Sequence, residues 1–154
     1  MKATTLLRDQ HRRLERLVVR LGGERHLRMP LVLQLVEELM THLSIEDHFF
    51  LLPVSDQVGI RVDRFRADQA CVRNAVLQAV FAEADDALFA ERLRELETVL
   101  DHHTRSIERD LLPLVESHVR MDELERIGDR MQSFWNAAIG GEGTTPASHV
   151  HAAE

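Results

Sequence analysis

Glycine and proline are scarce in this sequence of 154 residues, which contains seven of the former and four of the latter. An average protein has about 12% of the two residues together, and this chain has neither of them between Gly59 and Pro113. Strand-rich folds need a turn signal about every 8–12 residues, so this gap argues against a β-sandwich or a β-barrel. The absence of tyrosine and the single tryptophan argue in the same direction.

Disulfides, basic surfaces and membrane spans are also missing from the sequence. The single cysteine, Cys71, cannot form an internal disulfide, and the net charge of −7 argues against a nucleic-acid-binding domain. No segment approaches the ~18 consecutive apolar residues of a transmembrane helix, and the first residues lack the apolar run of a signal peptide. We therefore expect a cytoplasmic protein with no nucleic-acid partner and no membrane partner.

Hydrophobic residues make up 44% of the chain and recur at helical spacing in five segments. These segments predict helices over residues 4–21, 30–53, 61–82, 87–117 and 122–138. Asp85 and Asp86 are candidate N-caps of the fourth helix, and a loop is expected at 55–59. Four long amphipathic helices joined by short connections predict an all-α fold, an up-down-up-down four-helix bundle with a short fifth C-terminal helix. We expect the bundle to span residues 1–139 and the segment 140–154 to be a disordered tail.

The helical rows also predict which side chains face the core. Phe49 continues the inward row of the second helix, Leu77 lies inward on the third, and Leu114 lies inward on the fourth. The apolar stretch Phe49–Val54 has two open interpretations: it belongs to the core, or it forms the face of a homodimer.

Histidine is unusually frequent, since the chain has nine histidines and a single lysine. Three of them, His11, His42 and His103, interrupt apolar helical rows, whereas the other six lie in loops, in the tail or off the rows. Taken alone, His103 is explained by a core histidine that donates to a backbone carbonyl, and His11 and His42 are explained by histidines at a solvated end of the bundle. In an up-down bundle, however, the start of the first helix and the ends of the second and fourth lie at one pole, so the three side chains are expected to converge. His102, beside the fourth row, is the second choice for the ligand there.

Two carboxylates accompany these histidines. Glu46 lies one turn after His42 on the same face, and a glutamate in an apolar row is unfavourable unless it is paired or bound to a metal. The alternative interpretation is a solvated bundle end, where Glu46 faces water. Glu108 lies five residues after His103, at the edge of the row. Imidazoles and carboxylates together suit iron, manganese or zinc.

The order and helix placement of these motifs resemble those of the hemerythrin-like, His-His-Glu cation-binding family. The resemblance covers residues 4–135 and rests on the three histidines, on Glu46, and on the Leu-Leu-Pro sequences that follow in the second and fourth helices. It implies a four-helix bundle around a non-haem di-iron centre that binds or senses dioxygen, nitric oxide or peroxide, or that handles iron. The metal ligands that it implies, with both glutamates bridging the ions, are His11, His42, Glu46, His103 and Glu108.

The sequence departs from the family's pattern at two ligand positions. The family has a histidine on the third helix, whereas this chain has none between His48 and His102. Asp68 and Gln69 lie at that level. Asp68 is the candidate metal ligand, and the sequence leaves open whether Asp68 or Gln69 replaces the histidine. The family also has a glutamate four residues after the histidine of the fourth helix, where this chain has Ile107. These departures leave open a single metal ion, a manganese or zinc site, or no metal at all.

Two functions are compatible with these observations. The first is a non-haem iron protein that binds or senses a small diatomic ligand or peroxide; we expect binding rather than catalysis, because no nucleophile–base pair and no phosphate-binding glycine loop is visible. The second is a metal-free four-helix bundle that acts as a regulatory or protein-interaction module. A ferritin-like di-iron protein is excluded, because it needs Glu-x-x-His on two helices and the sequence contains none.

Overall fold

The computed structural model describes residues 1–23 and 25–140, so the predicted tail lies, apart from Gly140, outside the described residues. The described part contains helices and no strand, which confirms the all-α prediction. In chain order the elements are α1 (Ala3–Gly23), η1 (Arg25–Leu27), α2 (Arg28–Ile45), η2 (Glu46–Leu51), α3 (Leu52–Val58), α4 (Asp63–Phe81), α5 (Asp86–Arg105), η3 (Ser106–Leu111), α6 (Leu112–His118) and α7 (Met121–Ile139).

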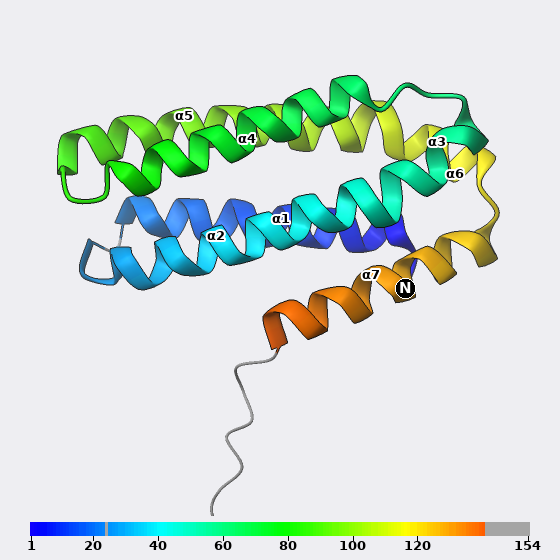
Figure 1. Cartoon of the computed structure of the whole chain (residues 1–154), viewed down its shortest axis with the longest axis horizontal. Coiled ribbons are helices and arrows are strands. Elements are labelled where there is room, and N and C mark those ends of the chain that lie inside the picture. The colour runs from blue at the N-terminus through cyan, green and yellow to red at the C-terminus, as the bar shows by residue number, and fades with distance from the viewer. Residues whose placement is uncertain (24, 141–154) are drawn as a thin grey trace, which may run out of the picture.

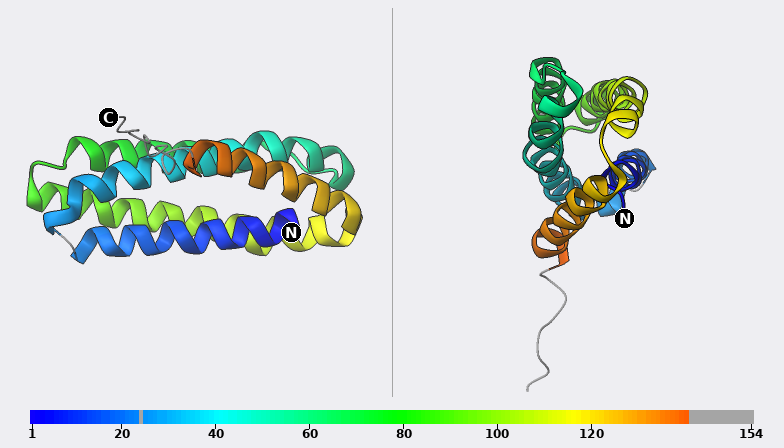
Figure 2. Two further views of the ribbon diagram at one scale, coloured as in Figure 1. Left: turned by 90° about the horizontal axis from the view of Figure 1, so that it is seen from below. Right: turned by 90° about the vertical axis from the view of Figure 1, so that its right-hand side faces the viewer.

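These elements join into four long rods and a fifth helix (Figure 1). The α2, η2 and α3 elements form one continuous rod, and α5, η3 and α6 form another. Rod α1 packs against α2 and α5, while α4 packs against α5 and α2, so the rods that contain α2 and α5 are diagonal. The fifth helix, α7, lies across α1 and the α2–η2 rod (Figure 2). No helix in the described ranges has a stretch long and apolar enough to cross a membrane.

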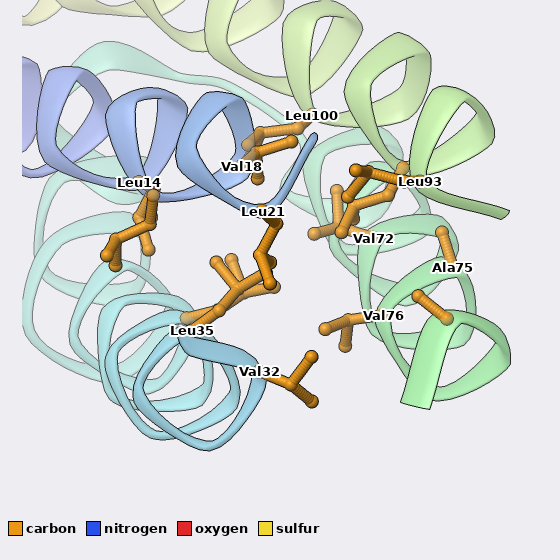
Figure 3. Packing of buried hydrophobic residues seen from close by; sticks show 14 of the residues in the cluster. Leu14, Val18, Leu21, Val32, Leu35, Val72, Ala75, Val76, Leu93 and Leu100 are labelled. Atoms are coloured by element: carbon orange, nitrogen blue, oxygen red, sulfur yellow. The ribbon is translucent and has the colours of Figure 1, made fainter. Parts of the chain in front are cut away.

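The interior consists of two apolar clusters, one toward each end of the bundle. The first fills the space between α1, α2, α4 and α5 and includes Leu14, Leu35 and Val76 (Figure 3). The second lies at the end covered by α7 and includes Leu7 and Phe50. Leu7 belongs to one cluster and Leu14 to the other, so the intervening turn of α1 lies at the boundary between them.

The helix ends follow recognisable signals, with one correction to the prediction. The Asp85 side chain accepts a hydrogen bond of 3.0 Å from the backbone N–H of Leu88, which confirms it as an N-cap. The predicted loop at 55–59 is wrong, because α3 continues through Val58. It ends only at Gly59, whose φ of 65° lies in the left-handed region that favours glycine.

Both composite rods contain a π-helical turn, which corrects two predicted core positions. The backbone N–H of Leu52 bonds to the carbonyl of Asp47, and that of Leu112 bonds to the carbonyl of Ile107, each five residues earlier. A π turn therefore places one extra residue in each rod, and the inward row shifts by one position. The buried side chains are Phe50 and Val115, whereas Phe49 and Leu114, which a continuous 3.6-residue period predicts to be inward, are only partly buried.

A third predicted core position, Leu77, is also wrong, because its side chain is 43% exposed. The buried row of α4 runs through Val72, Val76 and Ala79 toward α5 and α2. Leu77 lies beyond the edge of that row, where no rod of the bundle covers it.

The N-terminus and α7 approach each other closely at Gly128. A Cβ atom at this position would overlap the carbonyl oxygen of Met1 and meet the backbone of Lys2 and Ala3. Only glycine therefore allows α7 to lie this close to the start of the chain.

Candidate metal centre

Four buried polar side chains meet between the two apolar clusters. His11 comes from α1, His42 from α2, Glu46 from the first position of η2, and His103 from α5. All four side chains are fully buried, and one donor atom from each lies within 4.8 Å of the others. Three rods of the bundle thus bring together residues that are as many as 92 positions apart in the sequence (11 to 103).

The three imidazoles surround one carboxylate oxygen. Oε2 of Glu46 lies 3.7 Å from Nε2 of His11, 3.7 Å from Nε2 of His42 and 3.4 Å from Nε2 of His103. The ring centroids are 4.9–5.8 Å apart, and the ring planes cross at 77–83°. The rings therefore do not stack; each directs a nitrogen toward the same point from a different side.

These four converging atoms have no hydrogen-bond partner, although all of them are buried. A buried polar atom without a partner costs about 1–3 kcal/mol, and a metal cation would satisfy all four at once. Two donors that each lie ~2.1 Å from one ion at a tetrahedral angle are ~3.4 Å apart. The observed separations of 3.4–3.7 Å from Glu46 Oε2 match that spacing, so the residues fit a cation.

Hydrogen bonds on the far side of the ligands fix their orientation. Nδ1 of His42 lies 2.9 Å from Oε1 of Gln10, and Nδ1 of His11 lies 2.8 Å from Oε1 of Glu108. Because both acceptors are oxygens, each Nδ1 carries the proton and donates it, which leaves the lone pair on Nε2 for a metal. Oε1 of Glu46 in turn accepts a bond of 2.7 Å from the amide nitrogen of Gln69.

Burial and charge compete in setting the protonation of this group. Burial disfavours the charged form of Glu46, but the neighbouring imidazoles, with His103 foremost, hold the pKa of this carboxyl well below its ordinary value. Burial lowers the pKa of His42 well below its ordinary value, and positive charge on His11 adds to that effect. Burial also acts to lower the pKa of His11, yet its contacts with Glu108 and Glu46 outweigh burial and raise it. An ionised carboxylate beside a neutral imidazole is the state that binds cations.

Comparison with known protein families decides which family this four-helix arrangement belongs to. Residues 2–115 match the family model described as the hemerythrin HHE cation binding domain. The chain belongs to the hemerythrin HHE family. The matched segment contains all four converging donors and both π turns of this hemerythrin-like chain, and it ends before α7. No curated protein and no solved structure matches the chain.

Glu108 lies outside the group of converging donors of this hemerythrin-like protein. One of its oxygens accepts from Nδ1 of His11, and the other accepts a bond of 2.7 Å from the Arg12 guanidinium. Its contacts with His11 and Arg12 pull the pKa of Glu108 below its ordinary value. The structure therefore places this predicted bridging carboxylate behind His11, as a partner of the ligand.

Asp68 and His102 also face away from the converging donors. The Asp68 carboxylate lies 3.4 Å from Nε2 of His102, whose side chain is 72% exposed. The residues between which the sequence left a choice thus have distinct positions in the structure. His103 is buried and His102 is exposed, and Gln69 is buried whereas Asp68 is only partly buried.

Two residues that contact the site have no role predicted from the sequence. Gln10 and Arg12 flank His11, and they contact His42 and Glu108 respectively. The sequence contains a signal for Gln10, because this residue lies three positions after Leu7 and four before Leu14, on the apolar side of the helix. In the structure its side chain is only 4% exposed. Arg12 carries none, because its side chain lies half-exposed among several surface arginines.

Proposed function

We propose that the bundle binds a first-row transition-metal ion, iron above others, and that the bound ion takes a small ligand such as dioxygen, nitric oxide or peroxide. The observation that carries this proposal is the set of four buried donor atoms that converge without hydrogen-bond partners. Cation binding itself fits both the family and the buried histidine and glutamate cluster.

The donor set narrows the class of metal. Three imidazole nitrogens and one carboxylate oxygen suit iron, manganese or zinc, whereas calcium takes six to eight oxygens. The single thiol, that of Cys71, is exposed on α4 and is not part of the group, so no soft thiolate ligand is present to select copper(I). The order of the ligands along the chain resembles that of the family's non-haem iron centres, which favours iron among the three.

The burial of the site narrows the class of ligand. All four donor side chains have 0% exposure, so only a molecule of a few atoms reaches the metal position without opening the bundle. Four protein donors leave iron with further coordination positions that an exogenous ligand can occupy. When bound, iron supplies affinity for diatomic molecules and peroxide, and the apolar clusters on either side of the site exclude bulk water.

The proposal is tested on protein expressed with iron supplementation and purified without oxygen. We expect elemental analysis to find stoichiometric iron, and addition of nitric oxide to the ferrous protein to give new absorption bands. The His102→Leu variant should behave like the unmodified protein, because its side chain lies outside the group. If the unmodified protein retains no more metal than the His103→Leu variant, metal binding at this site is contradicted. Stoichiometric iron with no spectral response to nitric oxide, dioxygen or peroxide would contradict the proposed ligand class.

A further inference from the structure

Gln69 lies on α4 and forms a hydrogen bond with the donor group. Its side chain is fully buried in the row that contains Phe65 and Val72. Its amide nitrogen donates a hydrogen bond of 2.7 Å to Oε1 of Glu46. This bond leaves Glu46 with a single unengaged oxygen, Oε2, which is the atom that the three imidazoles surround.

A carboxylate that bridges two metal ions gives one oxygen to each of them. In this chain Oε1 of Glu46 is held by an N–H donor, and an amide N–H cannot coordinate a cation because its nitrogen lone pair is delocalised into the carbonyl. The amide oxygen of Gln69 is buried without a partner, but it belongs to a neutral group and cannot balance the charge of a second divalent ion.

The other rods add no second set of ligands around this position. Ile107, one turn after His103 on the inner row, is a fully buried apolar side chain with no donor atom. Glu108, the next residue, has both oxygens engaged, by Nδ1 of His11 and by the Arg12 guanidinium. Among the described residues, the group that could hold a metal ion therefore has four members with one converging donor atom each.

We infer that this centre holds one metal ion and not two, and that Gln69 is the positioning residue that sets this number by engaging Oε1 of Glu46. The inference rests on the proposed metal binding and specifies it further. Glu46 then acts as a monodentate ligand through Oε2.

Replacement of Gln69 by Glu should change the stoichiometry. The new carboxylate cannot donate the hydrogen bond that Gln69 gives to Glu46. It also places a second negative charge within hydrogen-bond distance of the Glu46 carboxylate. Two buried carboxylates that face each other repel when both are ionised, and either a shared proton or a cation between them removes the repulsion. With metal in excess, Gln69→Glu should therefore create a second, adjacent cation site. Gln34→Glu is the matched control, because Gln34 also donates a hydrogen bond to a buried glutamate, Glu38, but neither residue belongs to the donor group.

The experiment is an anaerobic titration of the full chain with ferrous ion, repeated with Zn²⁺ as a redox-inert probe, with bound metal measured after equilibrium dialysis. We expect one ion per chain for the unmodified protein and for Gln34→Glu, and two for Gln69→Glu. If Gln69→Glu does not fold, as judged by circular dichroism, Gln69→His tests the same point, because it also frees Oε1 and supplies a donor.

The possible results separate the two proposals. Two ions in the unmodified protein would overturn the inference while leaving metal binding intact. One ion in the unmodified protein and in folded Gln69→Glu and Gln69→His would overturn the role of Gln69. No ion in the unmodified protein would overturn the proposed function itself.

Discussion

Replacement of His103 by leucine should abolish the stabilisation that a metal gives to the bundle. His103 is fully buried, its Nε2 faces Glu46, and neither ring nitrogen has a hydrogen-bond partner. Leucine has a similar size and keeps the position apolar, like its row neighbours Leu100 and Ile107. The measured quantity is the difference in melting temperature with and without metal for each variant, so changes in the stability of the metal-free protein cancel.

The expected magnitude follows from mass action. A ligand present at 100 times its Kd stabilises the folded state by about 2.7 kcal/mol, which for a chain of this size corresponds to an increase in Tm of about 5–11 °C. Loss of even an outer partner of a metal ligand costs about 10–100-fold in affinity, so loss of a ligand should raise Kd by at least ~100-fold. At the same metal concentration the stabilisation then falls to about 0.4 kcal/mol, a Tm increase below ~2 °C.

The assay is differential scanning calorimetry with Zn²⁺ or with ferrous ion under anaerobic conditions. His102→Leu is the control, because the adjacent histidine is 72% exposed and faces Asp68; it should keep the full increase in Tm. An undiminished increase in His103→Leu, or an equal loss in His102→Leu, would refute the assignment of His103. The absence of any increase in the unmodified protein would instead support a metal-free interaction module.

Three further predictions follow from the contacts around the site. Glu108→Ala should weaken metal binding by about 10–100-fold without changing the stoichiometry, measured by chelator competition, because Glu108 holds the ligand His11 by Nδ1. Gly128→Ala should destabilise the protein by about 1–3 kcal/mol in urea unfolding, because the added Cβ overlaps the N-terminal backbone. Glu38→Gln should reduce the decrease in the free energy of unfolding as the pH falls. Burial disfavours the ionised form of Glu38, but its hydrogen bonds with Arg13 and Gln34 outweigh burial and lower the pKa of this carboxyl below its ordinary value of 4.5. Its stabilisation is therefore present above pH 4.5 and is lost as the pH falls through the lowered pKa.

Each of these variants has a matched control in the chain. Glu15→Ala removes the other carboxylate partner of Arg12 but does not touch His11, so an equal loss of affinity there would count against a specific role of Glu108. Gly23→Ala adds a Cβ with no atom within 4 Å and should leave the unfolding midpoint nearly unchanged. Glu37→Gln changes an exposed neighbour of Glu38; an equal effect on acid unfolding would refute the pKa argument.

The fold could be predicted because the helical spacing of apolar residues indicates where the helices lie, and the few glycines and prolines indicate most of their ends. Two of the three core positions predicted wrongly share a physical cause: a continuous 3.6-residue period assigns Phe49 and Leu114 to the core, but the π turns η2 and η3 shift the inward row to Phe50 and Val115. A π turn inserts one residue without changing composition or polarity. The spacing of apolar residues alone therefore gave no indication of it.

For the site, the sequence could indicate residues that interrupt apolar rows, which is how His11, His42 and His103 became candidates. It could not show in which direction each polar side chain points or which atoms form its hydrogen bonds. Glu108 has the right residue type and lies near the right level, but its direction depends on η3 and on the position of Arg12 across the bundle. The sequence left open whether Asp68 or Gln69 lies at the site, and the contact of Gln69 with Glu46 became visible only in three dimensions.

The most direct test of a one-ion centre is X-ray absorption spectroscopy of the anaerobically iron-loaded protein. The structure predicts that each iron has three imidazole ligands, supplied by His11, His42 and His103, and an oxygen from Glu46. It also predicts no second iron at the separation of ~3.5–4 Å that is typical of two-metal sites. An iron–iron contribution at that distance, or fewer than two imidazoles per iron, would contradict this assignment.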